Sequence, residues 1–238
     1  DTAECYTGTN PDGTVAYNEE VVGAVLKPVR NKVILASKCG VTHGKDHLIM
    51  DSRPQSIHKA LEGSLKRLGT DYIDLYYQHR IDPKVEPEEV AGTMSDLMKE
   101  GKIRAWGISE TDEAYLRRAH SVCPVTAIQN RYSMMARWYE NLFPVVEELG
   151  ITYVADFRSN KPQYTPEGFE KSRELLQMLR DMAAEKNATP GQISLAWMLC
   201  KKPFIVPIPG SRKPERLKEN FEAANICLSQ DEIAVIDE

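Results

Sequence analysis

Short apolar, β-branched and aromatic runs alternate along this chain with longer segments of helical periodicity, and this alternation constrains the fold more than any other feature. The runs are Lys32–Ser37, Asp71–Tyr77, Ile103–Ser109, Val125–Gln129, Ile151–Ala155 and Phe204–Ile208. Such runs are typical of buried parallel strands. Apolar residues recur at helical spacing within Ile57–Leu68 and Pro87–Glu100 between them. The pattern therefore predicts successive βα units.

Two helix starts carry recognisable signals. Ser52 and Gln55 have the spacing of a capping box, in which two side chains bond the first backbone N–H groups of a helix. Thr189, Pro190 and Gln192 combine a capping residue, a first-turn proline and a capping glutamine. We expect a helix to begin at each place.

The chain has 238 residues, of which 42% are hydrophobic, and it shows no long linker or composition break. These features favour one α/β domain spanning residues 1–238. The predicted fold is a (β/α)8 TIM barrel. Six of its eight strands are visible, so we expect the first strand or strands to be missing from an N-terminally truncated chain. A doubly wound open sheet is the competing topology, but the G-x-G-x-x-G signature of such sheets is missing.

The charge and composition narrow the class of function. A formal net charge of −5 provides no overall positive field for a phosphate backbone, so we expect no nucleic-acid partner. No apolar run approaches the roughly 20 residues of a membrane span, and no signal peptide is apparent. The five scattered cysteines contain no C-x-x-C pair, which argues against disulfides and a zinc site. We expect a cytoplasmic protein, and its oligomeric state stays open.

Polar residues that follow the predicted strands are the first candidates for catalysis, because active sites of such barrels lie at the carboxyl ends of the strands. Asp1 and Tyr6 follow the missing strand, Lys38 ends one run, and His79 ends another. Each residue alone is more often structural. Their joint position at strand ends favours an acid, a phenol, an ammonium and an imidazole at one mouth.

This set of groups suits protonation of an oxygen. A phenol is a poor proton donor at neutral pH, but an adjacent ammonium favours its ionised form, and Lys38 would do this for Tyr6. Asp1 would pair with the lysine and fix its direction. A neutral His79 would donate a hydrogen bond to the same substrate oxygen.

A second group of residues follows the last predicted strand, where Ile205–Gly210 runs into Ser211, Arg212, Pro214 and Arg216. A helix that starts at Pro214 has free N–H groups in its first turn, and the two arginines can bind phosphate oxygens. The alternative is a solvated basic turn. Cations are unfavourable at a helix start, so an anionic ligand would relieve the conflict.

His43, Asp46, His47 and Asp51 form a cluster of potential metal ligands. The segment follows a strand and lacks the helical pattern that would place both histidines on one face. We therefore interpret it as a solvated loop and predict no metal site.

Several segments together match one known family. They are residues 1–6 (D-T-A-x-x-Y), 18–23 (N-E-x-x-x-G), Ser37 with Lys38, the stretch LKRLGTDYIDLYYQHRID at 65–82, 106–110, 129–133 and 208–220. Over essentially its whole length the chain resembles the aldo-keto reductase family. The resemblance implies a (β/α)8 barrel that moves a hydride between NADP(H) and a small carbonyl compound without a metal.

The resemblance also implies roles for individual residues. The catalytic residues would be Asp1, Tyr6, Lys38 and His79, with Tyr6 as the acid. The residues implied to bind NADPH/NADP+ are Ser109 and Gln129 at the nicotinamide carboxamide, Gly210, Ser211, Arg212 and Arg216 around the 2′-phosphate, and Glu219 and Asn220 at the adenine end. NADPH would be preferred over NADH.

The chain differs from the family pattern at three places. Glu110 stands where many members have Asn, and Gly210 stands where many have a phosphate-binding Lys, for which we expect Arg212 to compensate. Family members continue the strand at Ala155 with an aromatic residue and a long glycine-containing loop, whereas here Asp156 follows directly. Either that cofactor loop is deleted or residues are missing between 155 and 156.

The sequence thus predicts an NADPH-dependent reductase of aldehydes or ketones, with the reverse alcohol oxidation also open. The alternative is an NADP(H)-sensing regulatory barrel that resembles a channel beta subunit. A third hypothesis is a barrel hydrolase that uses Asp1, His79 and Asp82 with a metal ion.

Overall fold

The computed structural model describes residues 1–45, 47–156, 168, 170 and 172–238. These residues form two compact units, Asp1–Gln129 and Asn130–Glu238. Within the described ranges, no helix is long and apolar enough to cross a membrane. That the chain forms a single domain stays a prediction.

A parallel sheet lies at the centre of the first unit. Its strands, in spatial order, are β3 (Ala36–Cys39), β6 (Ile73–Gln78), β7 (Ile103–Ser109) and β8 (Ala127–Arg131), whose last two residues belong to the second unit. All four strands overlap predicted runs, and β7 has the predicted bounds. β3 starts later than predicted: Lys32 ends a 3-10 helix, η1 (Lys27–Lys32), and residues 33–35 belong to no strand.

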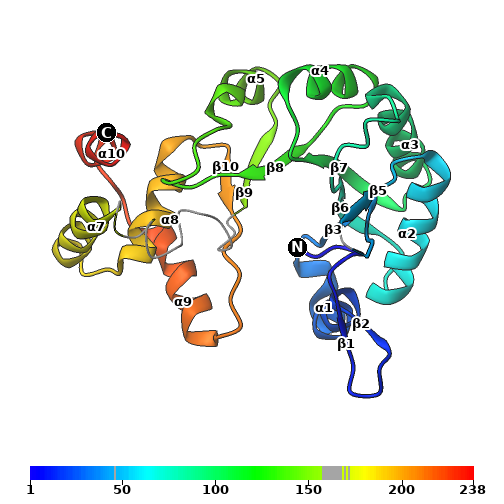
Figure 1. Ribbon diagram of the computed structural model, residues 1–238, viewed down its shortest axis with the longest axis horizontal. Helices are drawn as coiled ribbons and strands as arrows, with labels where there is room; N and C mark the ends of the chain where they lie inside the picture. Colours follow the sequence, from blue (N-terminus) through cyan, green and yellow to red (C-terminus); the bar gives the residue numbers. More distant parts are fainter. Residues whose placement is uncertain (46, 157–167, 169, 171) are drawn as a thin grey trace. The chain divides into compact units, whose positions relative to one another are not determined.

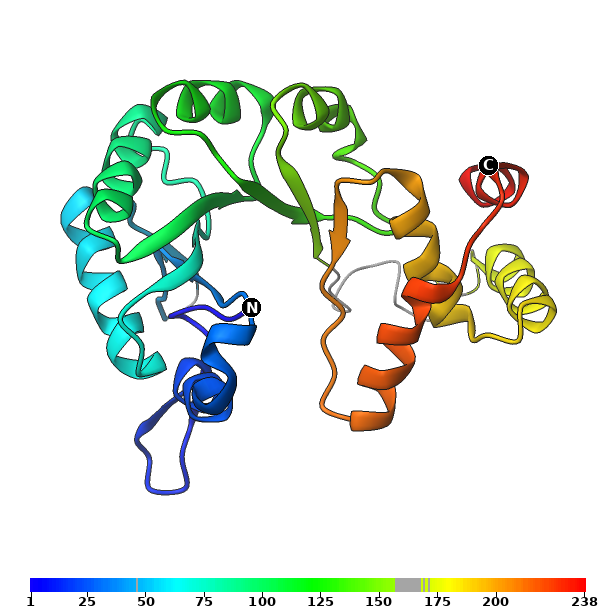
Figure 2. The same cartoon turned by 180° about the vertical axis from the view of Figure 1, so that it is seen from behind.

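Of the described α-helices in this unit, one precedes these strands and three connect them, as the alternating sequence pattern predicts. They are α1 (Asn18–Leu26), α2 (Pro54–Leu68), α3 (Pro87–Lys99) and α4 (Glu113–Val122). Figures 1 and 2 show α2, α3 and α4 along one face of the sheet. The apolar stripe of α3 is fully buried at Val90, Met94 and Leu97. Each such side chain stabilises the fold by roughly 1.5–3 kcal/mol.

The predicted capping box at Ser52 is wrong. Helix α2 has Arg53 at its N-cap and no side-chain cap bond. Ser52 is instead buried, where its backbone N–H donates to Asp82 Oδ2 at 3.1 Å and its hydroxyl accepts from Gln78 Nε2 at 3.0 Å. These bonds tie the segment before α2 to the carboxyl end of β6.

Two antiparallel hairpins stand beside the main sheet. They are β1 (Thr7–Thr9) with β2 (Val15–Tyr17), and β4 (Val41–His43) with β5 (Leu48–Met50). The second hairpin occupies the segment predicted to be a solvated loop, so His43 ends a strand and its ring bonds the Cys5 carbonyl. Asp46 of the predicted cluster lies outside the described residues.

The second unit contains the last two predicted strands and the helices around them. Its described elements are η2 (Glu140–Leu142), α5 (Phe143–Glu148), β9 (Thr152–Asp156), α7 (Arg173–Glu185), α8 (Pro190–Lys201), β10 (Ile205–Pro207), α9 (Pro214–Glu222), η4 (Ala223–Asn225) and α10 (Gln230–Asp237). β9 and β10 pair in parallel, with Tyr153 opposite Ile205. The capping box at Thr189 and Gln192 is present at the start of α8, as predicted.

An aromatic cluster forms the core of the second unit. Tyr132 stacks on Trp197 with ring centroids 5.3 Å apart, and it meets Tyr153 and Phe143 edge to face at 5.8 and 5.3 Å. The Trp197 indole N–H donates to Asp237 Oδ1 at 3.0 Å. This bond fastens α10 to α8, and the cluster packs α5, β9 and α8 together.

β9 runs through Ala155 and Asp156. The cofactor loop is predicted to be deleted or missing between 155 and 156, and residues 157–167, which follow, lie outside the described part of the chain. A gap between 155 and 156 therefore stays a prediction.

Candidate active site

Predicted site residues lie at the carboxyl edge of the sheet in the first unit, in or directly after β3, β6, β7 and β8. Lys38 lies near the end of β3, and Ser109 at the end of β7 pairs with Gln129 of β8. His79 directly follows β6, and its backbone N–H donates to the last carbonyl of β3 at 2.9 Å. The structure thus brings Lys38, His79, Ser109 and Gln129 to one edge, as parallel-strand topology predicts.

The segment before β1 lies along β3 and presents Asp1 and Tyr6 at the same edge. The Thr2 N–H donates to the Ala36 carbonyl at 2.9 Å, and the Glu4 N–H donates to the Lys38 carbonyl at 3.1 Å. These bonds hold residues 2–4 in register with β3. The chain therefore reaches Tyr6 just beyond the end of that strand.

Lys38 is a completely buried cation with an acidic partner. Its Nζ donates to Asp1 Oδ2 at 2.6 Å and to the Thr2 carbonyl at 3.0 Å. The lysine side chain is 0% exposed and that of Asp1 is 21% exposed. A buried ammonium needs a counter-charge, so the pair both neutralises Lys38 and fixes the direction of its head group.

The Lys38 ammonium lies between two phenol rings. Its Nζ is 5.2 Å from the centroid of Tyr6 and 5.9 Å from that of Tyr77. Burial raises the pKa of Tyr77 well above its usual range, so Tyr77 stays neutral and serves as packing. Tyr6 is half-buried and is the ring of the two that reaches a cavity.

His79 is 4% exposed and packs edge to face against Tyr6, with ring centroids 5.7 Å apart and an angle of 81° between the rings. Its Nδ1 lies 3.4 Å from Cys5 Sγ. Reasoning from the sequence missed this cysteine, because only its place in the chain beside Tyr6 hinted at a role. The four predicted catalytic residues are therefore one cluster.

A buried carboxylate supports β3 from behind. Glu19 is fully buried at the start of α1 and accepts from Ser37 Oγ at 2.5 Å and from Arg67 Nε at 2.7 Å. The guanidinium of Arg67 balances its charge. Because Ser37 precedes Lys38, these bonds hold the strand end that carries the lysine.

Arg80 connects the histidine to the predicted nicotinamide site. Its Nη1 donates to the His79 carbonyl at 2.6 Å and to Ser109 Oγ at 3.0 Å. Ser109 Oγ in turn donates to the Gln129 carbonyl at 3.0 Å. Among the described residues, the buried Gln129 Nε2 has no hydrogen-bond partner. A buried amide N–H without a partner is costly, so Gln129 is positioned to bond a ligand carbonyl.

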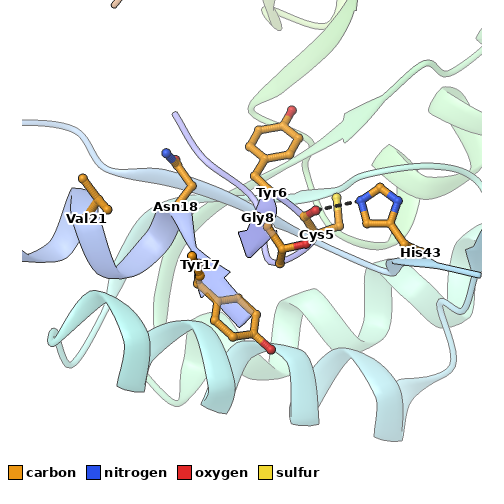
Figure 3. A pocket seen from close by; sticks show the side chains of 9 residues that line it. Cys5, Tyr6, Gly8, Tyr17, Asn18, Val21 and His43 are labelled. Atoms are coloured by element: carbon orange, nitrogen blue, oxygen red, sulfur yellow. Dashed lines mark hydrogen bonds between the residues drawn. The ribbon is translucent and has the colours of Figure 1, made fainter. Parts of the chain in front are cut away.

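A cavity of about 600 Å³ lies beside Tyr6 (Figure 3). Tyr6, Cys5 and His43 contribute to its wall, together with Tyr17 and Asn18 around the start of α1. Lys38 and His79 are not among the described residues that line this cavity. Tyr6 therefore stands between this cavity and the buried part of the cluster.

The predicted phosphate-binding segment lies in the second unit, between β10 and α9. Ser211 Oγ accepts from the Lys213 N–H at 3.1 Å, and α9 begins at Pro214 without a side-chain cap bond. Arg212 is exposed. The start of α9, which no side chain of the described residues caps, and this exposed guanidinium are features that suit an anionic ligand.

A cavity of about 410 Å³ in the second unit is lined in part by Gly210 and Asn220, two predicted cofactor residues. Arg216 donates to both carboxylate oxygens of Glu219, at 3.0 and 2.7 Å. Glu219 also accepts from Thr189 Oγ1 at 2.7 Å. Glu219 thus balances the charge of the Arg216 guanidinium, so Arg212 is the stronger candidate for a phosphate contact.

The hydrolase hypothesis finds no support in the contacts of its acids. Asp82 accepts from the backbone N–H groups of Ser52 and Lys84, and Asp1 is bound to Lys38. Each carboxylate thus already accepts hydrogen bonds from neighbouring residues.

Comparison with known proteins decides the family. The sequence matches the aldo/keto reductase family over residues 1–238. The chain belongs to the aldo/keto reductase family. It is 36% identical to aldo-keto reductase str7 of Strobilurus tenacellus, covering 92% of this chain and 72% of that protein. It is 34% identical to probable aldo-keto reductase 1 of Glycine max, covering 100% of this chain and 74% of the relative.

Solved structures give the same result for this aldo/keto reductase. The glycerol dehydrogenase of Gluconobacter oxydans matches with a TM-score of 0.85 at 27% identity, covering 93% of this chain and 76% of that chain. An aldo/keto reductase of Klebsiella pneumoniae, in complex with NADP and acetate, matches with a TM-score of 0.78 at 29% identity, covering 100% and 78%. The predicted family and its (β/α)8 barrel class are confirmed.

Proposed function

We propose that this aldo/keto reductase reduces an aldehyde or ketone to an alcohol with NADPH, and that Tyr6 protonates the carbonyl oxygen. The observation that carries the proposal is the buried Lys38 ammonium, fixed by Asp1 at 2.6 Å and lying 5.2 Å from the Tyr6 ring centroid. Such a cation stabilises the negative charge that Tyr6 acquires as its proton leaves.

The residues of the cluster divide the work of this step. The O–H bond of Tyr6 breaks as a new O–H bond forms on the substrate oxygen, and Tyr6 later recovers a proton from solvent. His79 donates a hydrogen bond to the same oxygen and orients the carbonyl group. Asp1 keeps the ammonium of Lys38 in place. NADPH, when bound, supplies the hydride that the carbonyl carbon accepts.

The residues of the first unit fit a nicotinamide. The buried Gln129 Nε2 lacks a partner among the described residues and would donate to the carboxamide oxygen, with Ser109 beside it. Arg80 already bonds Ser109, so it fixes the serine side chain. The fit thus rests on one orphaned buried donor and a positioned hydroxyl.

The residues after β10 would bind the adenosine end of NADPH. Arg212 and the first turn of α9 would hold the 2′-phosphate together with Ser211, and Glu219 and Asn220 would lie toward the adenine. Arg216 would contact the phosphate only after exchanging its bond to Glu219. A phosphate held in this way would make the enzyme prefer NADPH over NADH.

The similar solved structures support the proposed cofactor and the proposed reaction. Two structures from Klebsiella pneumoniae are complexes with NADP and with NADPH. The glycerol dehydrogenase of Gluconobacter oxydans acts in the alcohol-oxidising sense by its name. We therefore propose a small carbonyl substrate, with the reverse oxidation open. We also propose a cytoplasmic location, for which the scattered spacing of the cysteines in the sequence is the support.

The test is Tyr6→Phe, assayed as NADPH consumption with a panel of aldehydes and ketones. Loss of the acid should lower turnover by about 10²- to 10⁴-fold, while NADPH affinity measured by fluorescence stays unchanged. Tyr17→Phe is the matched control, since Tyr17 lines the same cavity as Tyr6.

Full activity of Tyr6→Phe would disprove the role of Tyr6. A wild-type protein that binds NADPH tightly but turns over none of the carbonyl compounds would instead favour the NADP(H)-sensing alternative.

A further inference from the structure

Cys5 contacts the imidazole that the proposed mechanism uses as a hydrogen-bond donor. Its Sγ lies 3.4 Å from Nδ1 of His79, although the two residues are 74 positions apart in the chain. Both side chains are buried, at 8% and 4% exposure. The contact therefore lies inside the protein, next to Tyr6.

The direction of this hydrogen bond follows from the chemistry of the two groups. Burial raises the pKa of the Cys5 thiol, so its sulfur keeps the proton at neutral pH. A thiol is a weak donor and a weaker acceptor, whereas the unprotonated nitrogen of a neutral imidazole is a good acceptor. The favoured arrangement is S–H donating to Nδ1.

A neutral imidazole carries one proton, so a ring that accepts at Nδ1 must carry its proton at Nε2. We propose that Cys5 is a positioning residue that holds neutral His79 in the Nε2–H tautomer, which is the form able to donate to a substrate oxygen. This inference rests on the proposed reductase function and assigns the tautomer to a specific neighbour.

The position of Cys5 is itself fixed from two sides. His43 Nε2 donates to the Cys5 carbonyl at 2.9 Å, drawn as the dashed line in Figure 3. The Cys5 side chain packs in a small apolar cluster with Ala3 and Val41, against which Tyr6 also packs. These contacts hold the backbone of Cys5 beside the histidine, next to the segment that carries Tyr6.

The opposite arrangement has a chemical consequence that an experiment can detect. If Nδ1 carried the proton and donated to sulfur, Nε2 would present a lone pair. A lone pair repels a carbonyl oxygen, so that tautomer would not orient the substrate. The two forms also differ in which ring nitrogen bears hydrogen.

The direct test is ¹⁵N NMR of the histidine side chains of the intact protein, with His79 assigned by comparison with His79→Gln. We expect wild-type His79 to be unprotonated at Nδ1 and protonated at Nε2. Cys5→Ala should give a mixture of tautomers, and Cys5→Ser should restore the wild-type form at least in part. Cys123→Ala is the control, because Cys123 is a buried thiol that contacts Met98.

The kinetic test follows from the same change. Loss of one hydrogen bond of ordinary strength should lower kcat of Cys5→Ala by about 3- to 10-fold, with the NADPH Kd unchanged and partial recovery in Cys5→Ser. A proton on Nδ1 of wild-type His79, or an unaltered tautomer in Cys5→Ala, would overturn the proposal. Because the NMR result needs no turnover, it separates failure of this inference from failure of the reductase function.

Discussion

Replacing Lys38 by methionine tests the electrostatic core of the proposed mechanism. Methionine has a similar length and suits a site where the lysine side chain is 0% exposed. The change removes the ammonium that lies 5.2 Å from the Tyr6 ring centroid and leaves the phenol in place. The variant therefore separates the charge from the proton donor.

The size of the effect can be worked from that distance. With the phenolate charge, which is shared between the oxygen and the ring, placed at the ring centroid, two unit charges 5.2 Å apart interact by about 3 kcal/mol at an effective dielectric constant of about 20. This is ~200-fold in rate, since each 1.36 kcal/mol is a factor of ten. The Asp1 carboxylate, 2.6 Å from Lys38 Nζ, offsets part of the field. We therefore expect kcat to fall by about 10- to 100-fold.

The assay is NADPH consumption at saturating carbonyl substrate, accompanied by NADPH titration and a thermal melt. Lys38→Arg keeps the charge and should retain more activity than Lys38→Met. Lys99→Met is a surface control, since Lys99 is paired with Asp96 in solvent. Unchanged kcat in a folded Lys38→Met protein would refute the electrostatic argument.

Three further predictions concern the cofactor and the stability of the fold. Arg212→Ala should raise the Kd of NADPH by about 10- to 100-fold and leave that of NADH nearly unchanged, because one charged phosphate contact is lost; equal losses would contradict this. Gly107→Ala should lower the free energy of unfolding by roughly 1–3 kcal/mol in urea, because a Cβ there would lie 2.5 Å from the Ala127 carbonyl oxygen. Gly92→Ala in α3 meets nothing within 4 Å and should gain up to ~1 kcal/mol, which makes it the matched control. Burial raises the pKa of the Glu4 carboxyl group above 4.5, so this group binds its proton more tightly in the folded than in the unfolded state. The free energy of unfolding should therefore fall as the pH rises through the window above 4.5. Urea titrations at several pH values should show this fall in the wild type and not in Glu4→Gln.

The strand ends of the site could be predicted because their causes are local. The runs at Lys38, His79 and Ser109 are rich in apolar, β-branched and aromatic residues, so their ends are visible in the sequence. Parallel pairing then places all such ends at one edge without further information. Gln129 follows the same rule at β8.

The prediction at Ser52 was wrong because its partners are distant in the sequence. Ser52 has the spacing of a helix cap, but its polar groups bond Gln78, the last residue of β6, and Asp82, which follows that strand. The Arg216 guanidinium, to which the family resemblance gives a phosphate contact, is paired with Glu219 on the same helix, and its contact with phosphate stays a prediction. Local spacing shows which bonds a side chain is able to make. The tertiary structure decides which of them it does make.

The contact of Cys5 with His79 shows the same limit at the centre of the site. This contact forms only because residues 2–4 lie along β3 and β6 pairs with β3. Cys5 and His79, which are far apart in the sequence, then both lie at the carboxyl end of β3. The sequence around Cys5 predicts neither of these two pairings. Replacing Cys5 by alanine would change neither the charge nor the members of the catalytic cluster, yet under the proposal it would change how the proton is shared between the two nitrogens of His79. If the proposal holds, the chemistry of this site depends on a neighbour that a motif written D-T-A-x-x-Y leaves unspecified.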